Sequence, residues 1–219
     1  MTSTDDEVFA ALRLRMVQTQ LRGRGIRDQR VLEVMARVPR HEFILERYRD
    51  QAYEDYPLPI GEEQTISQPY IVALMLELLE LTSDDHILEV GTGSGYVTAL
   101  LAELGKNVVT VERHASLAER ARELLQRLGY RNVTVVVGDG SEGCEACAPY
   151  NAILVSAAAS QVPAPLPAQL ADRGRMVIPV GPPEAQQLQV IRRENGQIHT
   201  TLREACRFVP LVSGGSFYV

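Results

Sequence analysis

The chain has 219 residues, 45% of them hydrophobic, which suits one domain with a substantial core. Its formal net charge of −6 disfavours a nucleic-acid partner held by phosphate contacts, and no apolar run reaches the roughly 18 to 20 residues that span a membrane. Three cysteines are too few for a disulfide scaffold and suit a reducing compartment. We therefore expect a cytoplasmic, monomeric protein with neither nucleic-acid nor membrane partners.

The first 68 residues show helical periodicity and precede any strand signal. Thr4 opens a capping-box pattern for one helix, and Asp28 is placed to cap a second. A third short helix is expected over residues 42–48. Residues 49–66 are rich in proline, glycine, tyrosine and acids and are expected to be irregular. The sequence thus predicts a helical N-terminal extension that ends in a loop.

The rest of the chain alternates short apolar runs with helical stretches, after a helix that starts at Pro69. This alternation predicts a parallel sheet covered on both faces. The expected helices are 96–104, 116–128 and 166–170, and the expected strands are 86–90, 108–112, 133–137, 152–156, 175–180, 188–193 and 201–209. Asn195-Gly196 predicts a tight hairpin turn between the last two strands. The predicted fold class is α/β: a doubly wound sheet, mostly parallel, with a C-terminal antiparallel hairpin.

The first expected strand runs into a glycine-rich segment, Glu-Val-Gly-Thr-Gly-Ser-Gly-Tyr, at residues 89–96. Gly91, Gly93 and Gly95 let the backbone turn tightly against a ligand. Dinucleotide enzymes favour G-x-G-x-x-G, whereas the third glycine falls one residue early here. Glu89 would also repel a pyrophosphate. The same carboxylate suits the sulfonium and ammonium groups of S-adenosylmethionine, either directly or through water.

Two further acids follow the next two expected strands. Glu112 lies 21 positions after Gly91 (112 − 91), the distance at which an acid reaches a ribose diol. Asp139, between two glycines, can accept a hydrogen bond from an adenine amino group. An acid after each of three successive strands predicts a nucleoside-containing cofactor, held by Glu89, Gly91, Gly93, Gly95, Glu112, Asp139 and Gly140.

With these residues in place, the sequence resembles the protein-L-isoaspartate (D-aspartate) O-methyltransferases. The matching segments occur in the family's order and cover nearly the whole chain: Val38-Pro-Arg-His41, Ala52-Tyr53-x-Asp55, Ile60-Gly61-x-x-Gln64-Thr-Ile-Ser67-Gln68-Pro69, residues 88–96, Gly138-Asp-Gly140 and Val209-Pro-Leu211. The resemblance implies a Rossmann-like class I methyltransferase fold in a single domain, 1–219. Residues 1–68 would be the helical extension and active-site loop, and residues 69–219 the cofactor-binding core with the C-terminal strands.

The resemblance also implies the reaction. A methyl group would pass from S-adenosylmethionine to the α-carboxylate of an L-isoaspartyl residue, and by extension a D-aspartyl residue, in a damaged protein. S-adenosylhomocysteine would be the product, without a metal. The ester then loses methanol as the following backbone nitrogen attacks, and the succinimide hydrolyses partly to aspartate. By the same resemblance Ser67 is catalytic, the cofactor is lined by Gln64, Thr65, Ile66 and Ser67, and the peptide meets the backbone of Val209, Pro210 and Leu211.

The chemistry of a carboxylate acceptor fits a site without a general base. A carboxyl group has an unperturbed pKa near 4, so the nucleophile is already ionised at neutral pH. The main tasks are alignment and partial desolvation. We therefore expect the Ser67 hydroxyl to orient one carboxylate oxygen. The alternative is a helix N-terminal residue that satisfies backbone donors ahead of Pro69.

Two positions depart from the family pattern, and two other functions stay open. Cys144 stands where relatives commonly carry an aromatic residue, and Asn151 stands where they commonly carry aspartate.

One alternative function is that of a dedicated aspartate O-methyltransferase in a peptide-maturation pathway. Relatives with that function are expected to carry an added peptide-capture domain. The other is a non-catalytic cofactor-binding module, which the two departures suggest and which the acid series and Ser67 disfavour.

Overall fold

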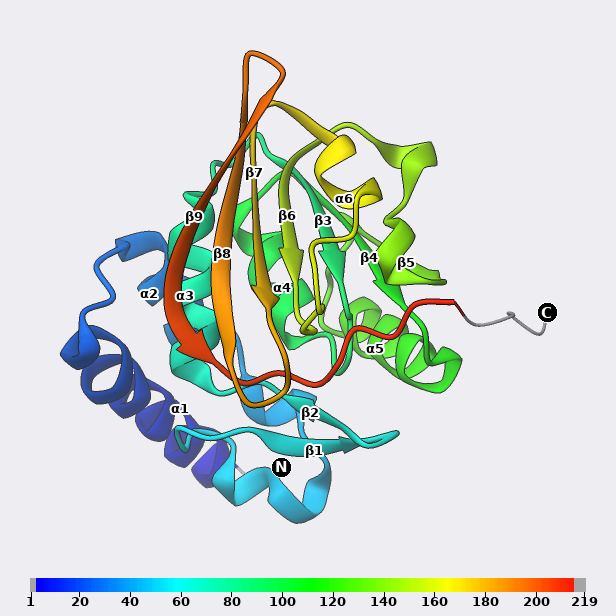
Figure 1. The fold of residues 1–219 in the computed structure, drawn as a ribbon. Coiled ribbons are helices and arrows are strands. Elements are labelled where there is room, and N and C mark those ends of the chain that lie inside the picture. Colours follow the sequence, from blue (N-terminus) through cyan, green and yellow to red (C-terminus); the bar gives the residue numbers. More distant parts are fainter. Residues whose placement is uncertain (1–2, 215–219) are drawn as a thin grey trace.

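The structure is a computed structural model that describes residues 3–214, with the side chains of residues 3–5 outside the description. A seven-stranded sheet in the order β5-β4-β3-β6-β7-β8-β9 runs through the molecule (Figure 1). The first five strands of this order pair in parallel and the last three in antiparallel fashion. The predicted fold class is confirmed. The strands are β3 (His86–Val90), β4 (Asn107–Glu112), β5 (Val133–Val137), β6 (Tyr150–Val155), β7 (Leu170–Val180), β8 (Gln186–Glu194) and β9 (Gln197–Cys206).

The turn between β8 and β9 has the predicted tight form. Asn195 and Gly196 have φ angles of 50° and 78°. Positive φ at both central residues gives a type I′ turn, whose twist matches that of two antiparallel strands. The hairpin extends past the ends of the neighbouring strands (Figure 1). Its second strand, β9, runs from Gln197 to Cys206, so it starts before the predicted strand 201–209 and does not include residues 207–209.

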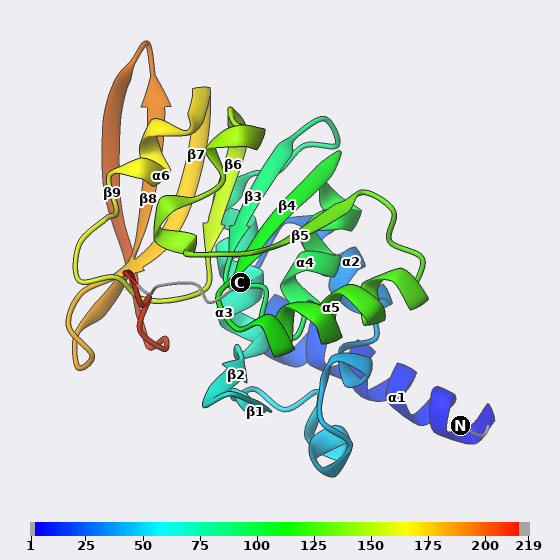
Figure 2. The same ribbon diagram turned by 90° about the vertical axis from the view of Figure 1, so that its right-hand side faces the viewer.

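Helices cover the two faces of the sheet unequally (Figure 2). Ile87 and Val108 belong to the core that includes the long helices, whereas Leu88 and Val109 belong to the core beside α6. Because successive strand residues point to opposite faces, each strand supplies both cores. Within residues 3–214, no helix combines the length and apolarity needed to cross a bilayer. The helices are α1 (Ser3–Met16), α2 (Gln29–Arg37), α3 (Pro69–Leu79), α4 (Tyr96–Leu104), α5 (Ala115–Arg127) and α6 (Pro165–Ala168).

The N-terminal extension shares the larger core with the sheet. Asp28 caps α2 as predicted, because its side chain accepts from two backbone N–H groups of the first turn. The predicted helix over residues 42–48 is wrong: Ile44 is extended and separates two 3₁₀ turns, Arg40–Phe43 and Glu46–Gln51. The capping box predicted at Thr4 involves a side chain outside the described ones. A π turn, Val17–Leu21, and a 3₁₀ turn, Arg22–Arg24, join α1 to the segment before α2.

Part of the segment predicted to be irregular forms a small ribbon. β1 (Leu58–Gly61) and β2 (Gln64–Ile66) pair in antiparallel fashion, apart from the main sheet. Glu62 and Glu63 make the turn, with φ angles of 51° and 56°. Glutamate rarely adopts this left-handed conformation, so the sequence carries no turn signal there. The ribbon matters for function because its second strand leads directly into Ser67.

Candidate functional site

A cavity lies at the carboxyl ends of the central strands, where β3 is flanked by β4 and β6. The chain order reverses at this point in the sheet, which is where open α/β folds bind ligands. The cavity, with the solvent space at its mouth, encloses about 830 Å³. Four segments supply most of its wall: the ribbon through Ser67, the glycine loop, the end of β4, and residues 209–212.

The glycine loop after β3 has the conformation that its sequence predicts. Gly91, Gly93 and Gly95 have φ angles of 93°, 52° and 86°, which side chains with a Cβ rarely adopt. The Gly91 N–H donates to the carbonyl of Val111 at 2.8 Å, so the loop is fastened to β4. Gly91 and Gly93 line the cavity, whereas Gly95 caps α4 behind it. The loop therefore brings bare backbone to the cavity wall.

Glu112 ends β4 and is held from both sides. One carboxylate oxygen accepts from the Gly93 N–H at 2.9 Å, and the other accepts from the His114 N–H at 2.9 Å. The residue is 6% exposed and still lines the cavity. A carboxylate has about four acceptor sites, so each oxygen keeps one for a ligand hydroxyl. Glu112 is thus fixed in the manner that recognition of a ribose diol requires.

Glu89 lies beneath the glycine loop and not on the cavity wall. It is fully buried, and one oxygen accepts from the Thr98 hydroxyl at 2.5 Å. Burial raises the pKa of Glu89 to about 8, and hydrogen bonds from Thr110 and Thr98 oppose this rise. In strand β3, Ile87 and Glu89 point to the same face, the face that α4 covers. In the described part of the chain, Glu89 therefore has no direct contact with the cavity.

Asp139 binds the C-terminal segment. One of its oxygens accepts from the N–H and hydroxyl of Ser141 at 2.9 and 2.7 Å, and the other accepts from the Gly214 N–H at 2.8 Å. Burial alone would raise the pKa of Asp139, but these hydrogen bonds and the charge of Arg113 lower it. Gly140 lines the cavity, while Asp139 stands behind it. The oxygen that accepts from Gly214 keeps a second acceptor site, so the adenine contact of Asp139 stays a prediction.

The four residues from Gln64 to Ser67 all line the cavity. The Ser67 carbonyl accepts from the Arg40 guanidinium at 2.8 Å. The N-cap of α3 is Gln68, whose side chain makes no capping hydrogen bond. The Tyr70 N–H of the first turn donates to the Asp55 carboxylate at 3.2 Å, so Asp55 and not Ser67 caps this helix. The alternative role of Ser67, capping the helix, is therefore not realised. Its hydroxyl is left for another partner.

Ser67 also belongs to the wall of a second cavity. Thr65, Ser67, Ser156 and Val209 line both cavities and so form the seam between them. The far side of the second cavity carries aromatic and charged side chains, namely Arg24, Tyr70, Glu204, Arg207 and Phe208. The two cavities therefore adjoin along these four residues, and Ser67 is one of them.

The segment 209–211 is fastened along one edge. The Ala158 N–H donates to the Val209 carbonyl at 2.8 Å, and the Leu211 N–H donates to the Ala158 carbonyl at 2.7 Å. Backbone groups of successive extended residues point to opposite edges, so the Pro210 carbonyl lies on the other edge. Proline has no N–H. All three residues line the first cavity. On the edge that does not bond Ala158, the Pro210 carbonyl is available to accept a hydrogen bond.

The two positions that depart from the family pattern lie away from the cavity. Asn151 sits at the start of β6, where its side-chain oxygen accepts from the His86 N–H at 2.8 Å. An aspartate oxygen could accept the same hydrogen bond. Cys144 packs against the core beside α6, and its N–H donates to Gln169 at 3.0 Å. Neither residue lines the cavity.

Several residues of the wall were not predicted from the sequence. Ser156 and Ala157 follow β6, and the rule that ligands bind at the reversal point of the sheet could have found them. Arg113 and His114, which follow Glu112, also line the cavity. In the described part of the chain, no group of three or more His, Cys, Asp or Glu side chains is arranged to hold a metal ion.

A family model described as protein-L-isoaspartate(D-aspartate) O-methyltransferase matches residues 13–216. The chain belongs to this family. A protein-L-isoaspartate O-methyltransferase of Koribacter versatilis is 54% identical over 215 residues, which are 98% of this chain and 97% of the relative. Another from Syntrophus aciditrophicus is 52% identical over 207 residues, which are 93% of this chain and 95% of the relative.

Solved structures agree with the family. A protein-L-isoaspartate O-methyltransferase matches with a TM-score of 0.82 at 30% identity, covering 93% of this chain and 66% of that one. A family member from Plasmodium falciparum, in complex with S-adenosyl-L-homocysteine, matches with a TM-score of 0.80 at 28% identity, covering 91% of this chain and 98% of that one. The likeness extends over the N-terminal extension as well as the sheet.

Proposed function

We propose that this chain is an S-adenosylmethionine-dependent enzyme that methylates the α-carboxylate of L-isoaspartyl residues, and of D-aspartyl residues, in damaged proteins. Ser67 carries the proposal, because it lies on the seam between two cavities. The first cavity has the glycine loop and Glu112 for a nucleoside donor. The second is open to a peptide. Membership of the family names the acceptor.

The residues of the first cavity fit the donor. Gly91 and Gly93 bring backbone without side chains, and the fixed carboxylate of Glu112 has acceptor sites for two ribose hydroxyls. When bound, the donor supplies an electrophilic methyl group on a sulfonium. We assign Glu89 and Asp139 to the support of this wall: Glu89 under the glycine loop, and Asp139 as the anchor of Ser141 and the C-terminal segment.

The acceptor needs alignment more than activation. A peptide carboxylate is ionised at neutral pH, so no residue has to remove a proton. The Ser67 hydroxyl donates a hydrogen bond to one carboxylate oxygen and leaves the other free to attack the methyl carbon in line. The Pro210 carbonyl accepts an N–H from the peptide backbone.

We also propose that the protein acts as a cytoplasmic monomer, folded as one domain, without nucleic-acid or membrane partners. The net charge of −6 opposes binding to phosphates. The three cysteines are free, as suits a reducing compartment. One core joins the N-terminal extension to the sheet, which supports a single domain.

A matched pair of peptides tests the function. The two peptides have one sequence and differ only in an isoaspartyl or an aspartyl linkage. With labelled S-adenosylmethionine, we expect base-labile label on the isoaspartyl peptide and background on its twin. Equal labelling would contradict the repair function and favour a dedicated aspartate methyltransferase. Donor binding without transfer to either peptide would favour a non-catalytic module.

Ser67→Ala tests the role of the hydroxyl. One hydrogen bond to a charged group contributes about 1.5–3 kcal/mol, so we expect turnover to fall about 10- to 100-fold. Affinity for the donor, measured by calorimetry, should stay within about threefold of the wild type, because the hydroxyl serves the acceptor. If donor binding were abolished instead, Ser67 would be a donor-pocket residue and the assigned role would be wrong.

A further inference from the structure

Arg40 is a buried cation close to the seam. It begins the 3₁₀ turn Arg40–Phe43, and its side chain is 0% exposed. Among the described residues no carboxylate forms an ion pair with it, and one terminal nitrogen, Nη1, has no hydrogen-bond partner. Burial lowers the pKa of Arg40 to about 10, against opposing effects of Tyr96, Tyr53 and Asp55. A buried charge without a paired partner is costly, and such groups gather at functional sites.

The contacts of Arg40 join the two loops of the proposed active site. Its Nη2 donates to the Ser67 carbonyl at 2.8 Å, and its Nε donates to the Ala52 carbonyl at 2.8 Å. The guanidinium carbon lies 4.9 Å from the centre of the Tyr96 ring. Tyr96 is the first residue of α4 and directly follows the glycine loop. The Arg40 side chain thus contacts both Ser67, on the proposed acceptor side, and Tyr96, at the end of the glycine loop.

We propose that Arg40 is a positioning residue for methyl transfer, which holds the Ser67 segment in register with the glycine loop. The inference rests on the orienting role proposed for Ser67. Fixing the Ser67 carbonyl fixes the backbone that carries the hydroxyl, and an error of about 1 Å in the position of such a group costs about 100-fold in rate. The guanidinium charge also favours an anionic acceptor at the seam, because a low-dielectric interior screens it weakly.

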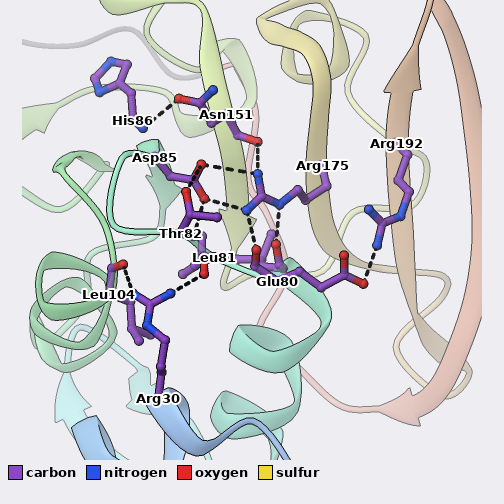
Figure 3. Close-up of polar contacts among 11 residues, drawn as sticks. Arg30, Glu80, Leu81, Thr82, Asp85, His86, Leu104, Asn151, Arg175 and Arg192 are labelled. Atoms are coloured by element: carbon purple, nitrogen blue, oxygen red, sulfur yellow. Dashed lines mark hydrogen bonds and ion pairs between the residues drawn. The ribbon is translucent and has the colours of Figure 1, made fainter.

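Arg30 offers a matched control. It also donates to two backbone carbonyls, those of Leu81 and Leu104, at 2.5 and 2.6 Å (Figure 3). It lies at the opposite end of the sheet from the cavity, beside the residues that precede β3 (Figure 3). Arg30→Lys therefore removes the same kind of two-pronged contact without touching the proposed active site. Arg30 is exposed whereas Arg40 is buried. The Arg30 variant therefore controls for the loss of a paired backbone contact, and the stability of each Arg40 variant is measured separately by urea unfolding.

The experiment compares Arg40→Lys and Arg40→Met with Arg30→Lys and the wild type. Arg40→Lys keeps the positive charge but loses the planar guanidinium that donates to two carbonyls at once. Arg40→Met keeps a similar side-chain volume and removes the buried charge. We expect both Arg40 variants to lose turnover about 10- to 100-fold, with donor affinity within about threefold of the wild type. Arg30→Lys should keep turnover within about twofold.

A folded Arg40 variant with turnover within twofold of the wild type would overturn the proposal, as would failure of both variants to fold, which would make Arg40 a folding residue. Combination with Ser67→Ala gives a second readout. The two losses should not multiply, because Arg40 acts through Ser67. Fully multiplied losses would also contradict the proposed role of Arg40.

The wild type assayed on the isoaspartyl peptide distinguishes failure of this inference from failure of the proposed function. An inactive wild type contradicts the proposed function, whereas an active wild type beside an active Arg40 variant contradicts only this inference.

Discussion

The two ends of the sheet use similar residues in opposite ways. At the amino end, Arg175 forms a buried ion pair with Asp85 at 2.5 Å, with side chains 10% and 7% exposed (Figure 3). The same guanidinium donates to the carbonyls of Leu79, Glu80 and Asn151. At the carboxyl end, Glu89, Tyr96 and Arg40 are fully buried, and each has a polar atom that makes no well-aligned hydrogen bond to the described residues. The Arg40 guanidinium interacts with Tyr96 and the Glu89 carboxyl group with Thr110, but neither group has an ion pair like that of Arg175.

This contrast separates stability from function. A buried polar group with all partners in place fixes one structure, and removal of either partner is costly. A buried polar group that lacks a hydrogen-bond partner lowers the stability of the fold. Such groups persist where the unused donor or acceptor serves a ligand or a reaction. The amino end therefore determines whether the chain folds, and the carboxyl end determines what it does. Four variants test this division.

The largest effect is expected at the amino end. Arg175→Met leaves Asp85 buried without its partner, so we expect the free energy of unfolding in urea to fall by about 3–5 kcal/mol. Donor affinity per folded molecule should not change. Arg192→Met is the control, because Arg192 pairs with Glu80 at the surface, where an ion pair contributes about 0–1 kcal/mol. Equal losses in the two variants would remove the distinction between the buried and exposed pairs.

At the carboxyl end, Glu112→Gln should weaken donor binding, and it also replaces one of the two oxygens that accept backbone N–H groups by an NH2 donor. The substitution removes the charge that accepts ribose hydroxyls, a loss of about 1.5–3 kcal/mol, or about 10- to 150-fold in the dissociation constant. Glu119→Gln on the exposed face of α5 is the control. Calorimetry with S-adenosylhomocysteine measures both. Unchanged affinity in Glu112→Gln would mean that the donor binds elsewhere.

Glu89 should make stability depend on pH. Burial raises its folded-state pKa to about 8 from an unfolded value of 4.5. The folded state therefore holds the proton more tightly, and the stabilising contribution is complete below the unfolded pKa and is lost as pH rises through about 8. Glu89→Gln removes this titration. Relative to wild type, its free energy of unfolding should rise with pH between about 5 and 8, with a slope of at most about 1.4 kcal/mol per unit. A flat difference would show that Glu89 is ionised throughout.

The smallest effect is expected at Asn151. Its side chain only accepts from the His86 N–H, and an aspartate oxygen can accept the same bond. Asn151→Asp should change the free energy of unfolding by less than about 0.5 kcal/mol and turnover by less than about twofold. A tenfold gain in turnover would show that this departure from the family pattern affects catalysis across the sheet.

The sequence predicted most elements because their signals are local. Strands β3 and β5 and helix α4 have the predicted bounds, since an apolar run between turn residues marks them directly. The three acids lie at the carboxyl ends of successive strands, Glu89 within β3, Glu112 as the last residue of β4, and Asp139 after β5. The β1–β2 ribbon was missed because two glutamates make its turn, and residues 40–51 form 3₁₀ turns where one helix was predicted.

By itself the sequence determined the α/β order, the C-terminal antiparallel hairpin, and which residue types gather at the carboxyl ends of the strands. Only the tertiary structure decided which way those side chains point. The Glu89 side chain lies under the glycine loop and accepts from the Thr98 hydroxyl. Asp139 accepts from the Gly214 N–H. Arg40 donates to the carbonyl of Ser67, which lies 27 positions later in the chain. The reason is physical: backbone pattern is set by neighbours in sequence, whereas the partner of a buried polar group is set by whatever packing brings within about 3 Å.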